Sequence, residues 1–329
     1  MPPVTPEDIA REQIDAMLTA SGWQVQDRKD LNLSAAFGVA VREVTLDTGE
    51  PDYLLFVDGK ALATVEAKKA GYTLVGVEEQ SAKYSAGANQ HIEFWHKPIP
   101  FAYESTGIET RFTNHFDPVP RSREVFSFHR PETLREWVQR GDSLPGRLKK
   151  LPPLIDRDLW AAQKKAIINL EKSLANNNQR SLIQMATGSG KTFTAVNFCY
   201  RLVKHADAKR ILFLVDRGNL GDQTLKEFQQ YITPDDGRKF NQIYNIQHLR
   251  SNKIDPVARV TISTIQRLYS ILKGEEEAAP DLDDLSIDAA DWDGSLFKET
   301  LPVAYHPKLP IANFDVLVPA ACPRSNYPL

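Results

Sequence analysis

The feature that most restricts how this chain can fold is a glycine-containing segment at residues 183–192, which reads IQMATGSGKT. A short apolar run at 181–185 overlaps its start, and the apolar residues after Thr192 recur at roughly helical spacing. This order predicts a strand, a tight turn and a helix. Such a turn directs several backbone N–H groups into one hollow at the helix N-terminus, where the helix dipole also favours an anion. The segment therefore predicts a phosphate-binding loop.

The side chains of this loop suit a nucleotide and its magnesium ion. Lys191 is placed to reach the β- and γ-phosphates, and the Thr192 hydroxyl to ligate Mg²⁺. The loop residues that we expect to bind the nucleotide are Thr187, Gly188, Ser189, Gly190, Lys191 and Thr192. A Gly/Ser turn with a solvated lysine is the alternative, and the predicted strand–turn–helix order disfavours it.

Length and composition set broad limits on the class of protein. The 329 residues suffice for two domains of ~150 residues each, and 42% hydrophobic with 25% charged residues is typical of a globular protein. No apolar run of roughly eighteen residues occurs and the start does not read as a secretory signal, so we expect a cytoplasmic protein with no membrane span. Two cysteines exclude a disulfide framework. With a net charge of −3, DNA contacts must come from local basic patches.

A predicted β-hairpin carries the second informative pattern. Two apolar runs, 53–57 and 61–65, flank Asp58-Gly59, which is a strong turn signal. Helices are expected on either side of this region, over 6–21 with Thr5 as the N-cap and over 131–139. The first part of the chain is therefore predicted to mix helices with an antiparallel strand pair.

Charged residues lie at the open ends of the hairpin. Asp52 begins the first strand, and Glu66 and Lys68 end the second, where their spacing of two puts both on one face. A three-residue loop would place Asp52 opposite Glu66, whereas a two-residue loop would turn Asp52 away. Two converging carboxylates make an Mg²⁺ site, and a nearby lysine can stabilise charge on a phosphodiester or orient the attacking water. A solvated hairpin with a surface ion pair is the alternative.

Two residues on a predicted helix after the hairpin favour the catalytic interpretation. Gln80 and Tyr84 are four residues apart and share one helical face. With the preceding carboxylates and lysine they form the order PD…ExK…QxxxY, which resembles the RecB-like branch of the restriction-endonuclease superfamily. The expected catalytic residues are Asp52, Glu66, Lys68, Gln80 and Tyr84, with Asp52 and Glu66 as the metal ligands.

The remaining chain gives the domain organisation. Residues 141–153 are rich in Pro, Gly and basic residues and form the predicted linker between domains at 1–140 and 154–329. In the second domain, apolar strands at 210–215 and 260–263 alternate with helices, which predicts a parallel, doubly wound sheet with ligands at the strand carboxyl ends.

Other polar segments give no chemistry. The acidic stretch 274–293 is expected to be a solvated or disordered loop. The histidines between residues 91 and 129 lack the spacing of metal ligands, so we expect them in the core or on the surface.

Taken together, the chain resembles the N-terminal part of the restriction (R) subunit of type I restriction–modification enzymes over nearly its whole length. The motifs that carry this resemblance are, in order, PD…EAK…QxxxY, FAYESTGIETRF, LWAAQ, MATGSGKT, LVDRxxLxxQ, STIQRL and LPVAYHPKLPIANFDV. The loop form ATGSGKT, with Met185 where the general pattern has glycine, is similar to that of superfamily 2 helicases and DNA translocases. The resemblance implies an α/β protein, in which a restriction-endonuclease-like (PD-ExK) domain precedes a RecA-like, parallel-sheet superfamily 2 helicase domain.

The resemblance also implies functions and partners. The first domain would cut double-stranded DNA with Mg²⁺, and the second would bind ATP, with Gln163 recognising adenine. Segments 216–223 and 264–267 would face DNA or transmit motion. The methyltransferase (M) and specificity (S) subunits would be partners, and target recognition would belong to them.

The C-terminal residues depart from this family pattern. After Val316 the family has an Asp-Glu-Cys-His box, whereas residues 320–323 here read AACP. The chain also ends before a second RecA-like domain that would supply an arginine finger. We therefore expect a truncated ATP-binding domain without hydrolysis or translocation. The alternatives are a catalytically silent DNA- or complex-binding remnant, and a superfamily 2 helicase fragment with an unrelated N-terminal domain.

Overall fold

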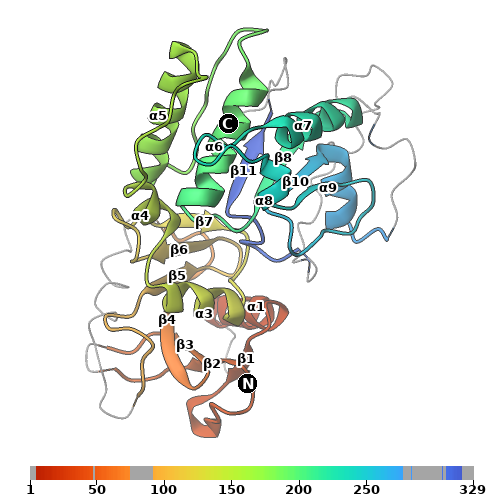
Figure 1. The fold of residues 1–329 in the computed structure, drawn as a ribbon. Coiled ribbons are helices and arrows are strands. Elements are labelled where there is room, and N and C mark those ends of the chain that lie inside the picture. The colour runs from red at the N-terminus through yellow and green to blue at the C-terminus, as the bar shows by residue number, and fades with distance from the viewer. Residues whose placement is uncertain are drawn as a thin grey trace. The chain divides into compact units, whose positions relative to one another are not determined.

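The structure is a computed structural model, and residues 5–46, 49–74, 92–276, 283, 306 and 309–320 are described. The chain separates into two compact units (Figure 1), one of Met1–Gly146 with Pro307–Ala312 and one of Arg147–His306 with Asn313–Leu329. Among the described residues, no helix is both long and apolar enough to span a bilayer.

The first unit is built on a seven-stranded mixed sheet whose spatial order follows the sequence, from β1 to β7. Its strands are β1 (Gln24–Gln26), β2 (Gly38–Arg42), β3 (Tyr53–Val57), β4 (Lys60–Ala67), β5 (Phe101–Ser105), β6 (Thr110–Asn114) and β7 (Arg123–Val125). The β1–β2 and β4–β5 pairs are parallel, and the other neighbours are antiparallel. Side chains that alternate along β3 enter two separate clusters, with Tyr53 and Leu55 in one and Leu54 and Phe56 in the other. Both faces of β3 are therefore buried.

Helices of the first unit contribute to one of these clusters. Helix α1 (Pro6–Ala20) starts at a capping box between Thr5 and Asp8 and buries Ile14 and Leu18. Helix α3 (Pro131–Arg140) buries Leu134 and Val138 in the same cluster. A short 3₁₀ segment, η1 (Arg28–Asp30), follows β1, and helix α4 (Leu144–Leu148) contains the boundary between the two units. The predicted helices over 6–21 and 131–139 are confirmed.

The hairpin of β3 and β4 combines features of both registers considered from the sequence. Its loop has two residues, Asp58 and Gly59, both with positive φ, and Val57 pairs with Lys60. A β-bulge then shifts the register, so that Leu55 pairs with Ala63 and Tyr53 with Val65. The bulge, which the sequence analysis did not foresee, restores the register that a three-residue loop would give.

The second unit contains a four-stranded, all-parallel sheet in the order β11-β8-β10-β9. Its strands are β8 (Ile211–Val215), β9 (Ile246–His248), β10 (Val260–Thr264) and β11 (Val316–Pro319). Its helices are α5 (Ala161–Ala175), α6 (Lys191–His205), α7 (Gly218–Gln230), α8 (Phe240–Ile243) and α9 (Ile265–Leu272). The predicted strands near 210–215 and 260–263 and their parallel arrangement are confirmed.

One predicted strand is wrong. Residues 181–185, expected to be a buried strand before the phosphate loop, form no regular structure, and Leu182 is 87% exposed. A strand exists only through pairing, and none of the described strands pairs with this run. A short apolar run alone does not determine whether the segment finds such a partner.

Candidate functional site

Asp52 and Glu66 meet at the open end of the β3–β4 hairpin. Because Tyr53 pairs with Val65, extending the register by one residue places Asp52 opposite Glu66. The Asp52 carboxylate also crosses to β4, where its Oδ2 accepts a hydrogen bond from the Ala67 N–H at 2.8 Å. The structure thus brings together the two residues predicted as metal ligands.

Lys68 completes the predicted group. Its Nζ donates to Glu66 Oε2 at 3.0 Å, and its backbone N–H donates to the Ser105 carbonyl at 2.8 Å, next to β5. Glu66 is only 5% exposed. A carboxylate held away from water needs a nearby cation or hydrogen bonds, and Lys68 supplies both.

Glu104 is a further acidic residue at this place, and the sequence analysis missed it. It lies on β5 in parallel register with Glu66 and is 1% exposed. A glutamate inside the otherwise strand-like FAYES peptide was the available signal. The parallel pairing of β4 with β5 could not be predicted, because about thirty residues separate the two strands in sequence.

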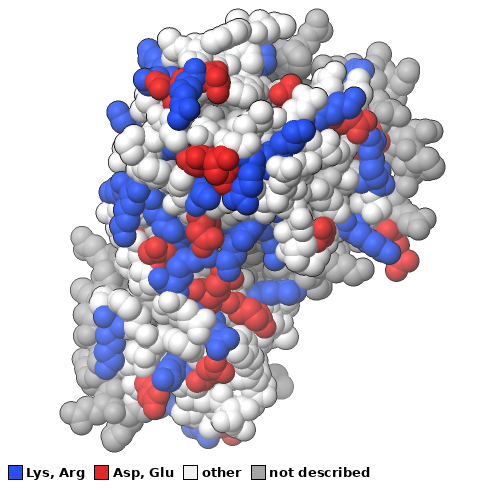
Figure 2. All heavy atoms as spheres, in the orientation of Figure 1, with Lys and Arg blue, Asp and Glu red and all other residues white. Residues whose placement is uncertain are grey.

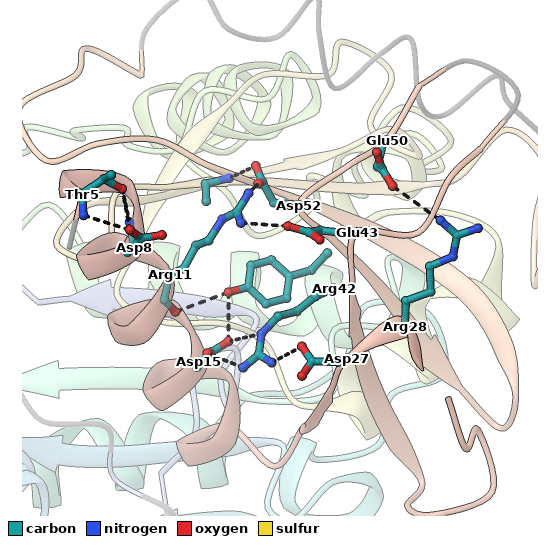
Figure 3. A network of polar contacts seen from close by, with 12 residues as sticks. Thr5, Asp8, Arg11, Asp15, Asp27, Arg28, Arg42, Glu43, Glu50 and Asp52 are labelled. Carbon is teal, nitrogen blue, oxygen red and sulfur yellow. Dashed lines mark hydrogen bonds and ion pairs between the residues drawn. The ribbon is translucent and has the colours of Figure 1, made fainter. Parts of the chain in front are cut away.

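Arg11 reaches the same place from α1 and divides its guanidinium between two carboxylates (Figure 3). Nη2 lies 2.5 Å from Asp52 Oδ1, and Nη1 lies 2.9 Å from Glu43 Oε1. Burial acts to lower the pKa of Arg11, but the hydrogen bonds and charges of Asp52 and Glu43 outweigh it and raise that pKa. Sequence patterns gave no signal for Arg11, because the contact joins residues that are 41 positions apart.

A second polar group fixes the start of β3 beside Asp52. Tyr53 donates its hydroxyl proton to Asp15 Oδ1 at 2.9 Å, and Arg42 binds Asp15 at 2.5 Å and Asp27 at 2.6 Å (Figure 3). Burial, together with the charge of Asp15, raises the pKa of Tyr53. The phenol therefore stays protonated and tethers the strand to α1.

The carboxylate oxygens at the end of the hairpin are of the chemical type that a hard divalent cation binds. Carboxylate oxygens are the ligands that Mg²⁺ prefers in proteins. Among the described residues, no group of three or more His, Cys, Asp or Glu side chains is arranged to hold a metal. Protein ligation would thus rest on the Asp52 and Glu66 pair, with water and substrate oxygens in addition. Gln80 and Tyr84 lie outside the described residues.

The predicted phosphate loop forms a tight turn before α6. Gly188 and Gly190 have φ values of +77° and +75°, and α6 begins at Lys191. The Lys191 ammonium lies over the loop, 3.3 Å from the Ala186 carbonyl oxygen. Thr192 lies in the first turn of α6 and is half-buried. The loop and helix are those predicted, although no strand precedes them.

Gln163 braces this loop from α5. Its Oε1 accepts the Trp160 N–H at 3.0 Å and its Nε2 donates to the Ser189 carbonyl at 3.1 Å. The side chain is 4% exposed. Both ends of the amide are therefore engaged within the protein, and adenine recognition by Gln163 stays a prediction.

A buried ion pair lies at the carboxyl end of β10. The Arg267 guanidinium binds both oxygens of Asp283 at 2.6–3.0 Å, and Thr264 Oγ1 donates to Asp283 at 2.7 Å. Thr264, Arg267 and Asp283 are all at most 5% exposed. Burial acts to raise the pKa of Asp283, but Arg267 and Thr264 lower it overall. The expected solvation of the acidic stretch 274–293 is therefore wrong for Asp283, the one residue described between 277 and 293.

Comparison with known proteins relates both regions to restriction enzymes. Residues 35–121 match the family "Type I restriction enzyme R protein N terminus", and residues 157–288 match "Type III restriction enzyme, res subunit". The chain is 28% identical to the type I restriction enzyme EcoKI endonuclease subunit of Escherichia coli K12, in a 328-residue alignment that includes 83% of this chain. It is 35% identical to the EcoAI endonuclease subunit of Escherichia coli, in a 276-residue alignment that includes 75% of this chain.

The chain is similar to the N-terminal part of type I restriction R subunits. The resemblance inferred from the sequence motifs is thereby confirmed. The matched regions cover only 28% and 32% of the EcoKI and EcoAI subunits, so the chain spans about a third or less of these relatives. A solved chain described as a fragment of an HsdR subunit of a type I restriction enzyme from Vibrio vulnificus YJ016 shares 19% identity, with a TM-score of 0.31, and the match covers 97% of this chain and 56% of that one.

The R-subunit pattern in the last residues is only partly within the described structure. Ala320 follows β11 and its N–H donates to the Leu214 carbonyl at 2.8 Å. The other residues that replace the acidic box, 321–323, lie outside the described residues.

Proposed function

We propose that the first unit is a PD-ExK nuclease domain that cleaves phosphodiester bonds of double-stranded DNA with Mg²⁺. The observation that carries this proposal is the opposed placement of Asp52 and Glu66, with the Lys68 ammonium on Glu66. That the substrate is DNA is inferred from the similarity to type I restriction R subunits. Gln80 and Tyr84 remain supporting residues in this proposal, and the cytoplasm remains the proposed location.

The residues at the end of the hairpin would have different roles in hydrolysis. Asp52 and Glu66 would hold the cation, which when bound would polarise the phosphodiester and lower the pKa of the attacking water. Lys68 would donate a hydrogen bond to the charge that develops on the phosphate oxygens. Glu66 is already buried and paired with Lys68, so these two side chains are held in place before substrate binds.

For the second unit we propose ATP binding by a RecA-like domain. The N–H groups of the loop and the Lys191 ammonium would bind the phosphates, and Thr192 would ligate Mg²⁺. In a full R subunit this domain would power DNA translocation, with M and S subunits as partners. Hydrolysis and translocation by this chain itself are not part of the proposal.

One other function has an observation in its favour. Arg11 contacts one Asp52 oxygen and the Ala67 N–H contacts the other. Because both oxygens already have partners within the protein, this arrangement also suits a catalytically silent, DNA- or complex-binding remnant. The helicase fragment with an unrelated N-terminal domain required Asp52 to point away from Glu66. The register of β3 and β4, extended by one residue, puts Asp52 opposite Glu66 and so favours the nuclease proposal over this alternative.

Nicking of supercoiled plasmid tests the nuclease proposal. With Mn²⁺ or Mg²⁺ and no nucleotide, the wild-type chain is expected to nick DNA, and Asp52→Asn, Glu66→Gln and Lys68→Met each to lower the rate by about a hundredfold or more. Arg28→Gln is the control, since Arg28 is an exposed side chain that contacts Thr45 at 2.8 Å and Glu50 at 3.7 Å. Nicking that persists in the Asp52 and Glu66 variants would contradict the proposal.

A further inference from the structure

The guanidinium group of Arg11 places a positive charge beside Asp52, one of the two predicted metal ligands. Its Nη2 lies 2.5 Å from Asp52 Oδ1, and the second Asp52 oxygen accepts the Ala67 N–H. The Asp52 side chain is 16% exposed, whereas that of Glu43, the other partner of Arg11, is 59% exposed. Of the two ion pairs that Arg11 forms, the one with Asp52 is therefore better protected from water and less screened.

The fold holds Arg11 in this position. Its helix is fixed at its start by the Thr5–Asp8 capping box, and one turn after Arg11 by Ile14, which is fully buried. Asp52 is fixed by its bond to β4. Glu43, which accepts from Nη1, follows β2 and donates its backbone N–H to the Asp52 carbonyl at 3.0 Å. Three elements thus converge on one guanidinium group (Figure 3).

We propose that Arg11 is a positioning residue that serves as an internal cation for Asp52 and competes with the divalent metal ion for its carboxylate. This inference rests on the proposed metal site of Asp52 and Glu66. A guanidinium and a metal ion on one carboxylate oxygen repel each other, so the ion must displace Arg11 from Asp52 Oδ1. Arg11 therefore orients Asp52 while the cation is absent and weakens cation binding.

Removing the positive charge is expected to tighten cation binding. In titrations followed by the electron paramagnetic resonance signal of free Mn²⁺, without nucleotide, Arg11→Gln should bind Mn²⁺ about fivefold more tightly than the wild-type chain, the equivalent of a partly exposed ion pair. Arg11→Met should do the same, and it is a second neutral variant with a strong helix former. Arg11→Lys keeps the charge and should remain close to wild type.

Two controls separate competition at Asp52 from a general change of charge. Arg28→Gln removes the same charge from the same unit, at a side chain that is 59% exposed and paired with Glu50, and should leave Mn²⁺ affinity unchanged. In an Asp52→Asn background, Arg11→Gln should not restore Mn²⁺ binding, because the shared carboxylate is gone. Circular dichroism spectra and melting temperatures establish that each variant is folded.

The outcomes distinguish this inference from the function on which it rests. If Asp52→Asn abolishes Mn²⁺ binding while the neutral Arg11 variants bind unchanged or more weakly, the competition is refuted and the metal site stands. A gain in Arg28→Gln equal to that in Arg11→Gln also refutes it. If Asp52→Asn leaves Mn²⁺ binding unchanged, the proposed metal site is wrong, and the inference falls with it.

Discussion

At the scale of single residues, Asp52 and Glu66 are held in different ways although they lie opposite each other. Asp52 contacts a guanidinium from another element, and Glu66 contacts the ammonium of its own strand end. Glu66 is the more buried, with a side chain 6% exposed against 16% for Asp52. A cation therefore offsets the cost of removing each carboxylate from water.

Asp283 provides a test of a buried ion pair in the second unit. Because its pKa is held below the ordinary value, the pair stabilises the fold above the ordinary pKa of aspartate, about 4, and this stability is lost as the pH falls through the lower, folded pKa. Asp283→Asn should be less stable than wild type by about 3 kcal/mol at pH 7. The difference should narrow below about pH 4.

Urea denaturation of the two proteins at a series of pH values measures this difference. Glu227→Gln, an exposed position on α7, is the matched control and should change stability little at any pH. A difference between wild type and Asp283→Asn that stays constant from pH 7 to pH 3 would show that the charge of Asp283 contributes nothing.

At the scale of elements, the turn before α6 depends on two glycines that have the same backbone conformation but different surroundings. A Cβ on Gly190 would lie 2.4 Å from Gln163 Nε2, whereas a Cβ on Gly188 would meet nothing within 4 Å. Both residues have positive φ, so alanine is strained at either position. Only Gly190→Ala also pushes Gln163 away from its bonds to Trp160 and Ser189.

Thermal unfolding of the two alanine variants separates these effects. Gly188→Ala should lose about 1 kcal/mol from backbone strain alone, and Gly190→Ala about 1–2 kcal/mol more, from displaced hydrogen bonds. Equal losses in the two variants would mean that the contact between α5 and the loop does not stabilise the unit.

Elements whose signal is local could be predicted from the sequence. Helix α1 has its cap, apolar stripe and stop within about twenty residues, and the Asp58-Gly59 turn defines its hairpin. The bulge in β4 could not be predicted, since it depends on packing that places Leu62 in the core. The run 181–185 fails for the same reason, because its pairing partner would lie far away in sequence.

At the scale of the whole molecule, each unit has its own kind of sheet and its own predicted site. The acidic hairpin of β3 and β4 lies in the middle of the mixed sheet of the first unit. The phosphate loop of the second unit leads into α6 without a strand directly before it. On the face shown in Figure 2, basic and acidic side chains are interspersed. This agrees with a net charge of −3.

The limits of the two units were harder to predict from the sequence than the motifs within them. Along the sequence, the boundary between the two units falls between Gly146 and Arg147, within the predicted linker 141–153. Residues 307–312 are grouped with the first unit. Composition marks a linker, but it cannot show that a distant segment returns to an earlier unit. The limits 1–140 and 154–329 therefore remain predictions.

The central claim is that Asp52 and Glu66 bind one metal ion together. Mn²⁺ calorimetry without nucleotide, which keeps the phosphate loop from adding a second metal site, tests it most directly with the wild-type chain, Asp52→Asn, Glu66→Gln and the double variant. We predict one site in the wild type that is lost in either single variant, with no further loss in the double variant. Unchanged binding in both single variants would contradict the claim and leave a silent binding remnant as the better account.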